Sequence, residues 1–287
     1  ADLTLDYIEK RAGLLLGQGP RGKQRQYTFP HRTFQEYLAA CWLADQPDFC
    51  QRGVDLARQN PAHWREVLTF AARQAKVGRG VPAADALVSC QAVDEWFKEH
   101  PTGDADWRAA VLAGEQLIEI GLAAVGMRAE HRVVRRRVAG WIGALLERGA
   151  LPIPEREKAS HVLARLGDER PGVGLKNGVP DIAWITIPEW PFLMGSKEGE
   201  GDGDERPQFT CKLLTQPYQI SRYPVTVSQY KAFVDAGGYG EKRFWTDVGW
   251  QWKQSNNLTK PYDNDPVFQT SNHPRVGVSW YEAIAFC

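Results

Sequence analysis

The stretch that decides the fold of the C-terminal part is VPDIAWITIPEWPFLMGS, residues 179–196. Its apolar residues Ile182, Trp184 and Ile185 predict a short strand, because β-branched and aromatic side chains suit a pleated, half-buried surface. A turn rich in proline follows, and three further apolar residues run up to Gly195. We therefore expect two short strands that are joined by a proline-centred turn.

Two helix starts follow this stretch. Thr226, after Pro224-Val225, is the residue type that caps a helix N-terminus. In HPRVGVSWYEAIAFC, residues 273–287, Ser279 and Glu282 have the spacing of a capping box. We expect helices to begin at both places. The apolar residues of the second helix have no later partner in the sequence, so we expect more of the same domain beyond Cys287.

Before residue 170 the sequence has helical periodicity instead. Residues 25–31 alternate like a strand, and residues 32–45 carry an apolar stripe at helical spacing. Together with an expected helix and strand over residues 3–19, this order predicts a winged-helix remnant. Residues 46–166 read as several helices, of which one starts at Asn60-Pro61 and one spans residues 84–100. The stripe of residues 32–45 consists of Phe34, Tyr37, Leu38, Cys41 and Trp42.

One motif in this region imitates a phosphate-binding loop. Gly17, Gly22 and Lys23 have the spacing GxxxxGK. Position 24 is glutamine where such loops need serine or threonine for magnesium, and a strand is expected to follow instead of a helix. We therefore interpret residues 17–24 as the turn of the wing and not as a nucleotide site.

Composition excludes several classes of protein. The 287 residues carry 35 basic and 35 acidic side chains, so no overall field favours nucleic acid or a membrane surface. No run of 18 apolar residues is present, and no secretory signal is visible at the start. The five cysteines form no CxxC pair, which predicts reduced thiols and a cytoplasmic protein. One helix carries five arginines that we expect to form a solvated face; binding of phosphates or of an acidic partner is the alternative. They are Arg132, Arg135, Arg136, Arg137 and Arg148.

A first resemblance concerns the region before residue 75. The segment YTFPHRTFQEYLAACWLA, residues 27–44, resembles the one that closes the winged-helix region of NACHT-type STAND NTPases, and residues 60–72 resemble the helical region after it. This resemblance implies an ATPase module upstream. It is carried by Phe29, His31, Phe34, Gln35, Glu36, Tyr37, Leu38, Ala39, Ala40, Trp64, Arg65 and Glu66.

A second resemblance covers the region after residue 178. Several blocks in order are similar to the opening part of a formylglycine-generating-enzyme-type (FGE-sulfatase, sulfatase-modifying-factor) domain. They are Ile187-Pro188, Phe192 to Ser196, Glu205 to Pro207, Pro224 to Thr226, Tyr230, Phe233, His273-Pro274 and Val278 to Ala283.

The two resemblances together imply the fold class and the domains. We expect an α+β protein, with an all-α N-terminal region (winged-helix remnant plus helical bundle) followed by a C-type-lectin-like FGE-sulfatase domain that is incomplete at its C-terminus. The expected domains are the winged-helix remnant 1–45, the helical region with a linker helix 46–175, and the FGE-type domain 176–287.

No catalytic, cofactor-binding or metal-binding residue is carried over by the resemblance. The copper-binding cysteine pair and the calcium sites of the family are expected beyond Cys287, and Cys211 does not match their positions. The acidic loop 197–207 could offer oxygen ligands to calcium, but we interpret it as a solvated connector. The related sulfoxide synthases use iron that is held by histidines of a second domain, and no paired histidines on one helix are evident here.

The candidate ligand-binding residues are Trp245, Trp250 and Trp252, on a long insertion rich in aromatic residues. They could form a surface that contacts a ligand, or they could pack the loop onto the domain.

Fusion to a NACHT-like segment favours a recognition protein over an enzyme. We expect a signalling or defence protein whose lectin-like domain binds a protein or peptide ligand without chemistry in this chain, and which could be a variable protein of a diversity-generating retroelement. The alternative is a formylglycine-generating oxidase that acts on a peptide cysteine, with its catalytic cysteines beyond residue 287.

Overall fold

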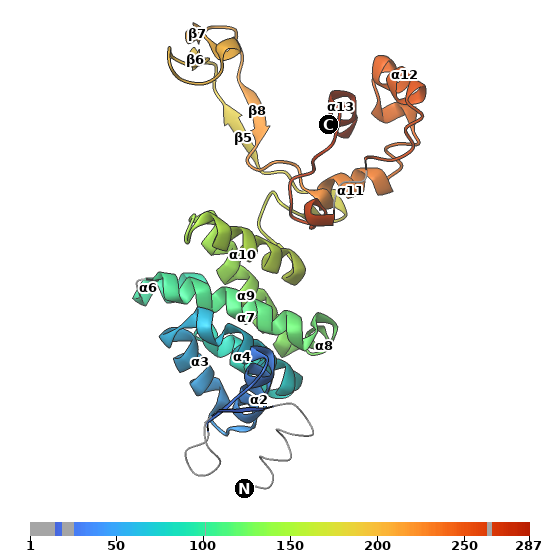
Figure 1. Ribbon diagram of the computed structural model, residues 1–287. Helices are drawn as coiled ribbons and strands as arrows, with labels where there is room; N and C mark the ends of the chain where they lie inside the picture. Colours follow the sequence, from blue (N-terminus) through green and yellow to red (C-terminus); the bar gives the residue numbers. More distant parts are fainter. Residues whose placement is uncertain (1–14, 19–25, 101, 263–265) are drawn as a thin grey trace. The chain divides into compact units, whose positions relative to one another are not determined.

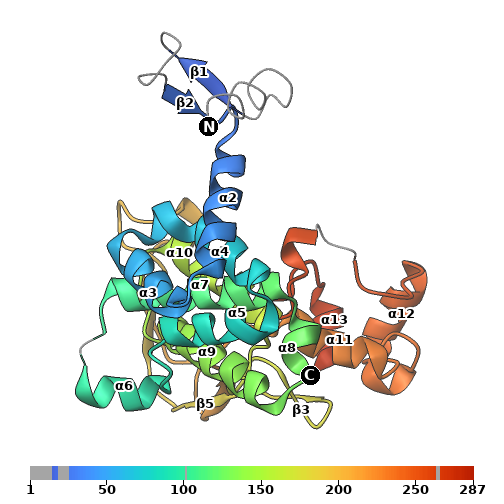
Figure 2. The same ribbon diagram turned by 90° about the horizontal axis from the view of Figure 1, so that it is seen from below.

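The computed structural model describes residues 15–18, 26–100, 102–262 and 266–287. The chain divides into two compact units, residues 1–168 and residues 169–287, and each unit is described by itself. Figures 1 and 2 show the first unit as a stack of helices and the second as short strands and helices joined by long loops. Among the described helices, none has both the length and the apolar character needed to cross a bilayer.

The first unit begins with a two-stranded antiparallel hairpin and continues as helices. In the hairpin Leu16 lies opposite Thr28, and Gly17 lies opposite Tyr27. Helix α7 lies at the centre, where it packs against α4, α5, α9 and α10. The elements are β1 (Leu16–Gln18), β2 (Gln26–Thr28), α2 (Arg32–Asp45), α3 (Phe49–Gln59), α4 (Pro61–Gln74), α5 (Lys76–Leu87), α6 (Val93–Glu99), α7 (Asp104–Ile120), α8 (Leu122–Gly126), α9 (Ala129–Glu147) and α10 (Ile153–Leu166).

The core of this unit is continuous and closely packed. Trp141 of α9 is 1% exposed, and its indole nitrogen donates to the carbonyl of Gln91 at 2.9 Å. Gly114 allows α7 to approach its neighbours, because a Cβ at this position would lie 2.5 Å from a methyl carbon of Val162. A larger residue there would have to push α10 away, and interiors packed at crystal density give way only at a cost.

Several expectations for the first unit can now be compared with the structure. The hairpin and the helix after it are confirmed as elements, but residues 3–14 and 19–25 lie outside the described residues, so the winged-helix remnant stays a prediction. Helix α4 starts where predicted, with the Asn60 side chain accepting from the His63 amide. The single helix predicted over residues 84–100 is wrong. The chain breaks there between α5 and α6, where Ser89 and Cys90 have φ values of +57° and +54°.

The arginine face of α9 is less solvated than predicted. Arg137 bonds both carboxylate oxygens of Asp85 at 2.5 and 2.6 Å. Arg135 donates to the carbonyl of Leu166 at 2.6 Å, and Arg132 donates to that of Gly126 at 2.8 Å. The sequence could not indicate the contacts of Arg135 and Arg137, because their acceptors lie 31 and 52 residues away.

The second unit is built from short elements. Strands β5 and β8 pair antiparallel, with Trp184 opposite Ser221, and β6 and β7 pair with Phe192 opposite Cys211. The elements are β3 (Leu175–Lys176), β4 (Val179–Pro180), β5 (Trp184–Ile187), β6 (Phe192–Met194), η2 (Gly203–Glu205), β7 (Phe209–Cys211), β8 (Tyr218–Ser221), α11 (Val227–Asp235), η3 (Lys242–Phe244), α12 (Asp247–Ser255), η4 (Pro266–Phe268) and α13 (Trp280–Phe286).

The two strands predicted within residues 179–196 are confirmed as β5 and β6. Gly195 ends β6 with a φ of +87°, and a Cβ there would lie 2.5 Å from the carbonyl oxygen of Glu205. Glycine is therefore required at this turn. Many apolar side chains of the two strand pairs are exposed, Trp184 among them at 58%. The C-type-lectin-like description stays a prediction.

Both predicted helix caps are confirmed, and they connect the helices to the rest of the unit. The Thr226 hydroxyl accepts from the Gln229 amide at 3.3 Å and donates to the carbonyl of Val173 at 2.8 Å. The Gln229 side-chain amide donates to the carbonyl of Asp181 at 2.6 Å. A small aromatic core lies between α11, α12 and α13; it consists of Tyr230, Phe233, Tyr239, Trp245 and Ala285.

Candidate functional site

The second unit contains an open pocket of about 660 Å³ beside α12 and the start of α13. One wall comes from the end of α12 and the loop after it, and the other comes from the segment that leads into α13. The lining residues are Trp252, Asn256, Asn257, Leu258, Thr259, Lys260, Pro261, Tyr262, Gly277, Val278, Ser279 and Glu282. Aromatic rings, side-chain amides and one carboxylate in a concave surface are typical of a small-molecule site.

Local sequence rules place the α12 wall. The Thr246 hydroxyl accepts from the Gly249 amide at 3.1 Å and fixes the helix start. The helix ends at Ser255. Two residues later, Asn257 has a φ of +52°, in the left-handed region that asparagine adopts more readily than most residues. Between these ends, the Trp252 ring packs 5.1 Å from that of Tyr281. The indole is thus held between α13 and the pocket.

A buried carboxylate forms part of the other wall. Glu282 is 5% exposed, and its side chain accepts from the Ser279 amide at 2.8 Å and from the Tyr239 hydroxyl. The hydroxyls of Tyr230 and Tyr239 are 3.0 Å apart. The three side chains form a chain of hydrogen bonds that runs from the aromatic core to the edge of the pocket. Such a network is rigid when all its members are satisfied.

Burial keeps both phenols of this network protonated. Burial raises the pKa of Tyr230 to about 12, since the charged form loses its hydration; the nearby Glu282 carboxylate acts in the same direction. The pKa of Tyr239 is raised as well, first by burial and then by its hydrogen bond to Glu282. Tyr239 therefore remains a hydrogen-bond donor, and the Glu282 carboxylate is oriented by two fixed donors.

The three predicted tryptophans occupy different environments. Trp245 is 6% exposed, and its indole nitrogen donates to the carbonyl of Gly238 at 2.7 Å. Trp250 is half-buried under the ammonium of Lys253, which lies 4.6 Å from the ring centre. Trp252 lines the pocket. The structure brings only Trp252 of the three to this cavity, and ligand contact by any of them stays a prediction.

Sequence reasoning missed the role of two further residues. Glu282 was recognised as a helix cap, and nothing in its spacing shows that its second oxygen bonds Tyr239, 43 residues earlier. Tyr239 lies in a glycine-rich segment, GGYG, which reads as a loop. An aromatic residue between glycines was the available signal, because glycines allow the backbone to bring such a ring into a core.

Among the described residues, no three histidine, cysteine, aspartate or glutamate side chains are arranged to hold a metal ion. We therefore derive no step through a metal ion. In the acidic loop, the Ser196 hydroxyl donates to the Glu205 carboxylate at 2.7 Å. Cys211 is buried in β7, and Cys287 is exposed at the end of α13.

Comparison with known proteins identifies the class of the second unit. Residues 176–287 match the model of the "Sulfatase-modifying factor enzyme 1-like domain" family. The predicted FGE-sulfatase domain is therefore present in this chain.

Individual relatives then give a more particular likeness. The chain is 34% identical over 95 residues to a protein named hercynine oxygenase from Mycolicibacterium thermoresistibile, which is 31% of this chain and 21% of that protein. It is 32% identical over 95 residues to the hercynine oxygenase of Mycolicibacterium smegmatis, covering 31% of this chain and 22% of the relative. The chain thus spans about a fifth of the length of the curated relatives it matches.

These findings correct the expected function. Relatives of the FGE-type domain are named as oxygenases, which contradicts the prediction of a recognition module without chemistry. The prediction gave too much weight to the NACHT-like segment at the other end of the chain. The family match at residues 176–287 does not extend to that segment, so the resemblance to NACHT-type proteins stays a prediction and carries no functional argument.

Proposed function

We propose that the second unit is part of an oxygenase that acts on a small molecule, with hercynine as the first substrate to test. The observation that carries this proposal is the 34% identity to a hercynine oxygenase within a matched enzyme-domain family. The pocket beside α12 supports it, since about 660 Å³ suits a small organic substrate.

In this proposal the residues of this chain bind and orient the substrate. Trp252 offers an aromatic face, and Glu282 offers a carboxylate whose position is fixed by Tyr239. A carboxylate held in this way can accept hydrogen bonds from a substrate without reorganising. The chemistry of oxygen activation is left to groups outside the residues described here.

A second candidate substrate is a peptide cysteine, as in the formylglycine-generating reaction that the resemblance implies. The description of the matched family as sulfatase-modifying factor favours it. The pocket is open to solvent, which is compatible with either substrate.

The test is a binding and turnover experiment on the full chain. Hercynine and a peptide containing the motif CxPxR would be titrated by calorimetry, and oxygen uptake would be followed with and without added iron(II) or copper. We expect hercynine to bind, and Trp252→Ala and Glu282→Gln to weaken binding about tenfold, the effect of losing one good polar or aromatic contact. Trp280→Ala is the matched control, since Trp280 is an exposed tryptophan on α13 that does not line the pocket.

Each outcome decides between the candidates. Peptide binding without hercynine binding transfers the proposal to the peptide-cysteine reaction. If neither compound binds or is oxidised, or if Trp280→Ala weakens binding as much as Trp252→Ala does, the oxygenase proposal is wrong.

We further propose a reducing, cytoplasmic setting with no nucleic-acid partner, supported by five free cysteines and a formal charge of zero.

A further inference from the structure

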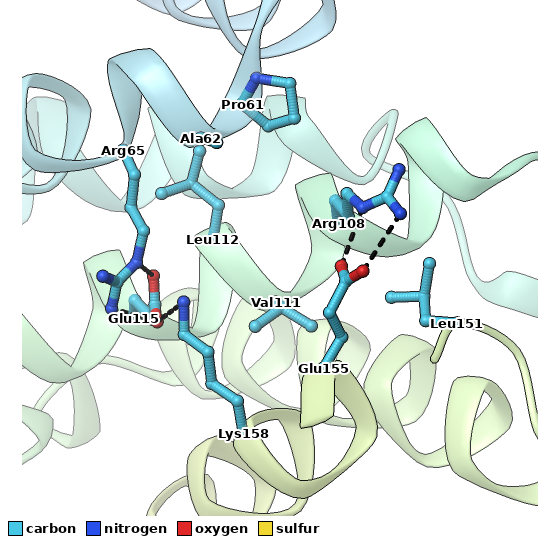
Figure 3. Close-up of a pocket in the computed structure, with 10 residues that line it drawn as sticks. All are labelled: Pro61, Ala62, Arg65, Arg108, Val111, Leu112, Glu115, Leu151, Glu155 and Lys158. Atoms are coloured by element: carbon cyan, nitrogen blue, oxygen red, sulfur yellow. Dashed lines mark hydrogen bonds and ion pairs between the residues drawn. The ribbon is translucent and has the colours of Figure 1, made fainter. Parts of the chain in front are cut away.

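The helical unit contains a second cavity, of about 460 Å³, that the proposed oxygenase function does not use. It is a groove over one face of α7, between the first turns of α4 and of α10 (Figure 3). From α7 come Arg108, Val111, Leu112 and Glu115, which have the spacing of a single helix face. The groove therefore runs along α7 for roughly 10 Å, seven residues at the helical rise.

The middle of the groove is apolar and its two ends are charged. Val111 and Leu112 are almost fully buried and form the floor, and Ala62 and Leu151 add to the walls. Leu151 has a φ of +68°, a conformation that a bulky residue rarely adopts. Figure 3 shows Val111 between the two charged groups.

At the charged end near α4, two cations of the lining meet a single carboxylate of the lining. Both side-chain oxygens of Glu115 accept from Arg65, at 2.7 Å each, and the Lys158 ammonium lies 3.1 Å from the same carboxylate. Two cations thus share one carboxylate within the groove, although Glu66 also contacts Arg65 from outside at 3.1 Å. An ammonium has three N–H donors, and this ion pair occupies one of those of Lys158.

At the other end, one arginine of the lining meets one carboxylate of the lining. Arg108 donates to the two oxygens of Glu155 at 2.7 and 3.1 Å. This pair, like that of Arg65 with Glu115, is a bidentate contact in which the guanidinium matches a carboxylate.

Within the lining, three cations face two carboxylates, and Lys158 is the cation without a bidentate partner of its own. Two exposed carboxylates, Glu66 and Asp104, contact Arg65 and Arg108 from outside the lining at 3.1 and 3.4 Å, where solvent screens them.

We propose that this groove binds a small organic anion, a molecule with one carboxylate or phosphate group on an apolar body. The anionic group lies at Lys158 and Arg65, and the apolar body lies over Val111 and Leu112. The cavity volume is in the range of small-ligand sites, and its walls combine an apolar floor with a few fixed polar groups, as such sites do.

The test is a calorimetric titration of the full chain with three compounds. These are 3-phenylpropionate, phenyl phosphate and the neutral 3-phenylpropanol. We expect one or both anions to bind and the alcohol to bind at least tenfold more weakly, as expected when a charge-assisted contact is lost. The first two compounds distinguish a carboxylate from a phosphate ligand.

Three variants locate the binding site. Lys158→Gln removes the cation without a bidentate partner and should weaken anion binding at least tenfold. Ala62→Leu fills the groove from an exposed position of α4 and should weaken binding of the anion without changing its charge partners. Arg73→Gln is the matched control, because Arg73 makes a 2.7 Å ion pair with Glu119 that also joins α4 to α7 but lies outside the groove.

The proposal is wrong if neither anion binds at millimolar concentration, or if the alcohol binds as well as the anions do. It is also wrong if Arg73→Gln reduces binding as much as Lys158→Gln, since the ion pairs would then only join helices. Thermal melting of each variant shows whether it is folded. Should Lys158→Gln fail to fold, Ala62→Leu alone decides the outcome.

Discussion

The two units differ in the size of their apolar cores. In the helical unit Trp141 is 1% exposed and is surrounded by a core shared by α4, α5, α7, α9 and α10, whereas Trp184 of β5 is 58% exposed. The core of the helical unit joins α7 to helices on both sides of it in the sequence, α4, α5, α9 and α10. The second unit has a small aromatic core and two strand pairs whose apolar faces are largely uncovered within the described residues.

The two units are stabilised in different ways. Helices satisfy their backbone internally, so amphipathic helices need only pack their apolar faces together. A two-stranded ribbon is marginal in water without further strands or a covering layer. In the second unit, the hydrogen bond between Tyr239 and Glu282 joins segments 43 residues apart and helps to fix the structure.

The largest expected effect is the difference in stability between variants of Trp141 and of Trp184. Trp141→Ala should lower the free energy of unfolding by about 3–5 kcal/mol, because it leaves a large cavity in a closely packed core. Trp184→Ala should cost less than about 1 kcal/mol, since most of that side chain is already in water. Urea unfolding followed by circular dichroism measures both. Equal costs would show that Trp184 is buried in solution.

A smaller effect tests the network of the second unit. Tyr239→Phe should cost about 1–3 kcal/mol, because the buried carboxylate of Glu282 loses a donor. Tyr262→Phe is the control, since Tyr262 is 70% exposed. Thermal unfolding followed by tryptophan fluorescence compares them. If the two variants melt alike, the network does not stabilise the unit.

The same network predicts a dependence of stability on pH. Because the pKa of Tyr230 is raised to about 12 from 10, and that of Tyr239 is raised too, the fold favours the neutral phenols. Their contribution is complete below pH 10, where the unfolded chain is also protonated, and is lost as pH rises from 10 towards 12. The urea midpoint should therefore be lower at pH 11 than at pH 9. In a variant that carries both Tyr230→Phe and Tyr239→Phe, the midpoint should fall less between the two pH values.

The smallest expected effect concerns ion pairs on the surface, which occur in both units. Pairs four residues apart with an exposed cation occur in both, Arg32 with Glu36 on α2 and Lys231 with Asp235 on α11, each at 2.7 Å. Arg32→Gln and Lys231→Gln should each change stability by less than about 0.5 kcal/mol. Urea midpoints test this. A loss above 1 kcal/mol for either variant would contradict the view that surface pairs are minor in both units.

Local chemistry made part of the fold predictable from sequence. The caps at Asn60, Thr226 and Ser279, the strands on either side of the proline turn, and the glycine that ends β6 all follow from rules that act within a few residues. The predicted helix over residues 84–100 failed because no local signal requires left-handed backbone at Ser89 and Cys90.

By itself, the sequence indicated the helix starts at Asn60, Thr226 and Ser279 and the strands β5 and β6, because capping and apolar spacing are local properties. The FGE-type domain was indicated by the resemblance of its sequence blocks to a known family. Only the tertiary structure decided which tryptophan lines a pocket, which carboxylate Tyr239 meets, and which cations meet over α7. Those pairs are separated by tens of residues, from 43 between Tyr239 and Glu282 to 50 between Arg65 and Glu115. Packing brings them together, and no local rule specifies their distance.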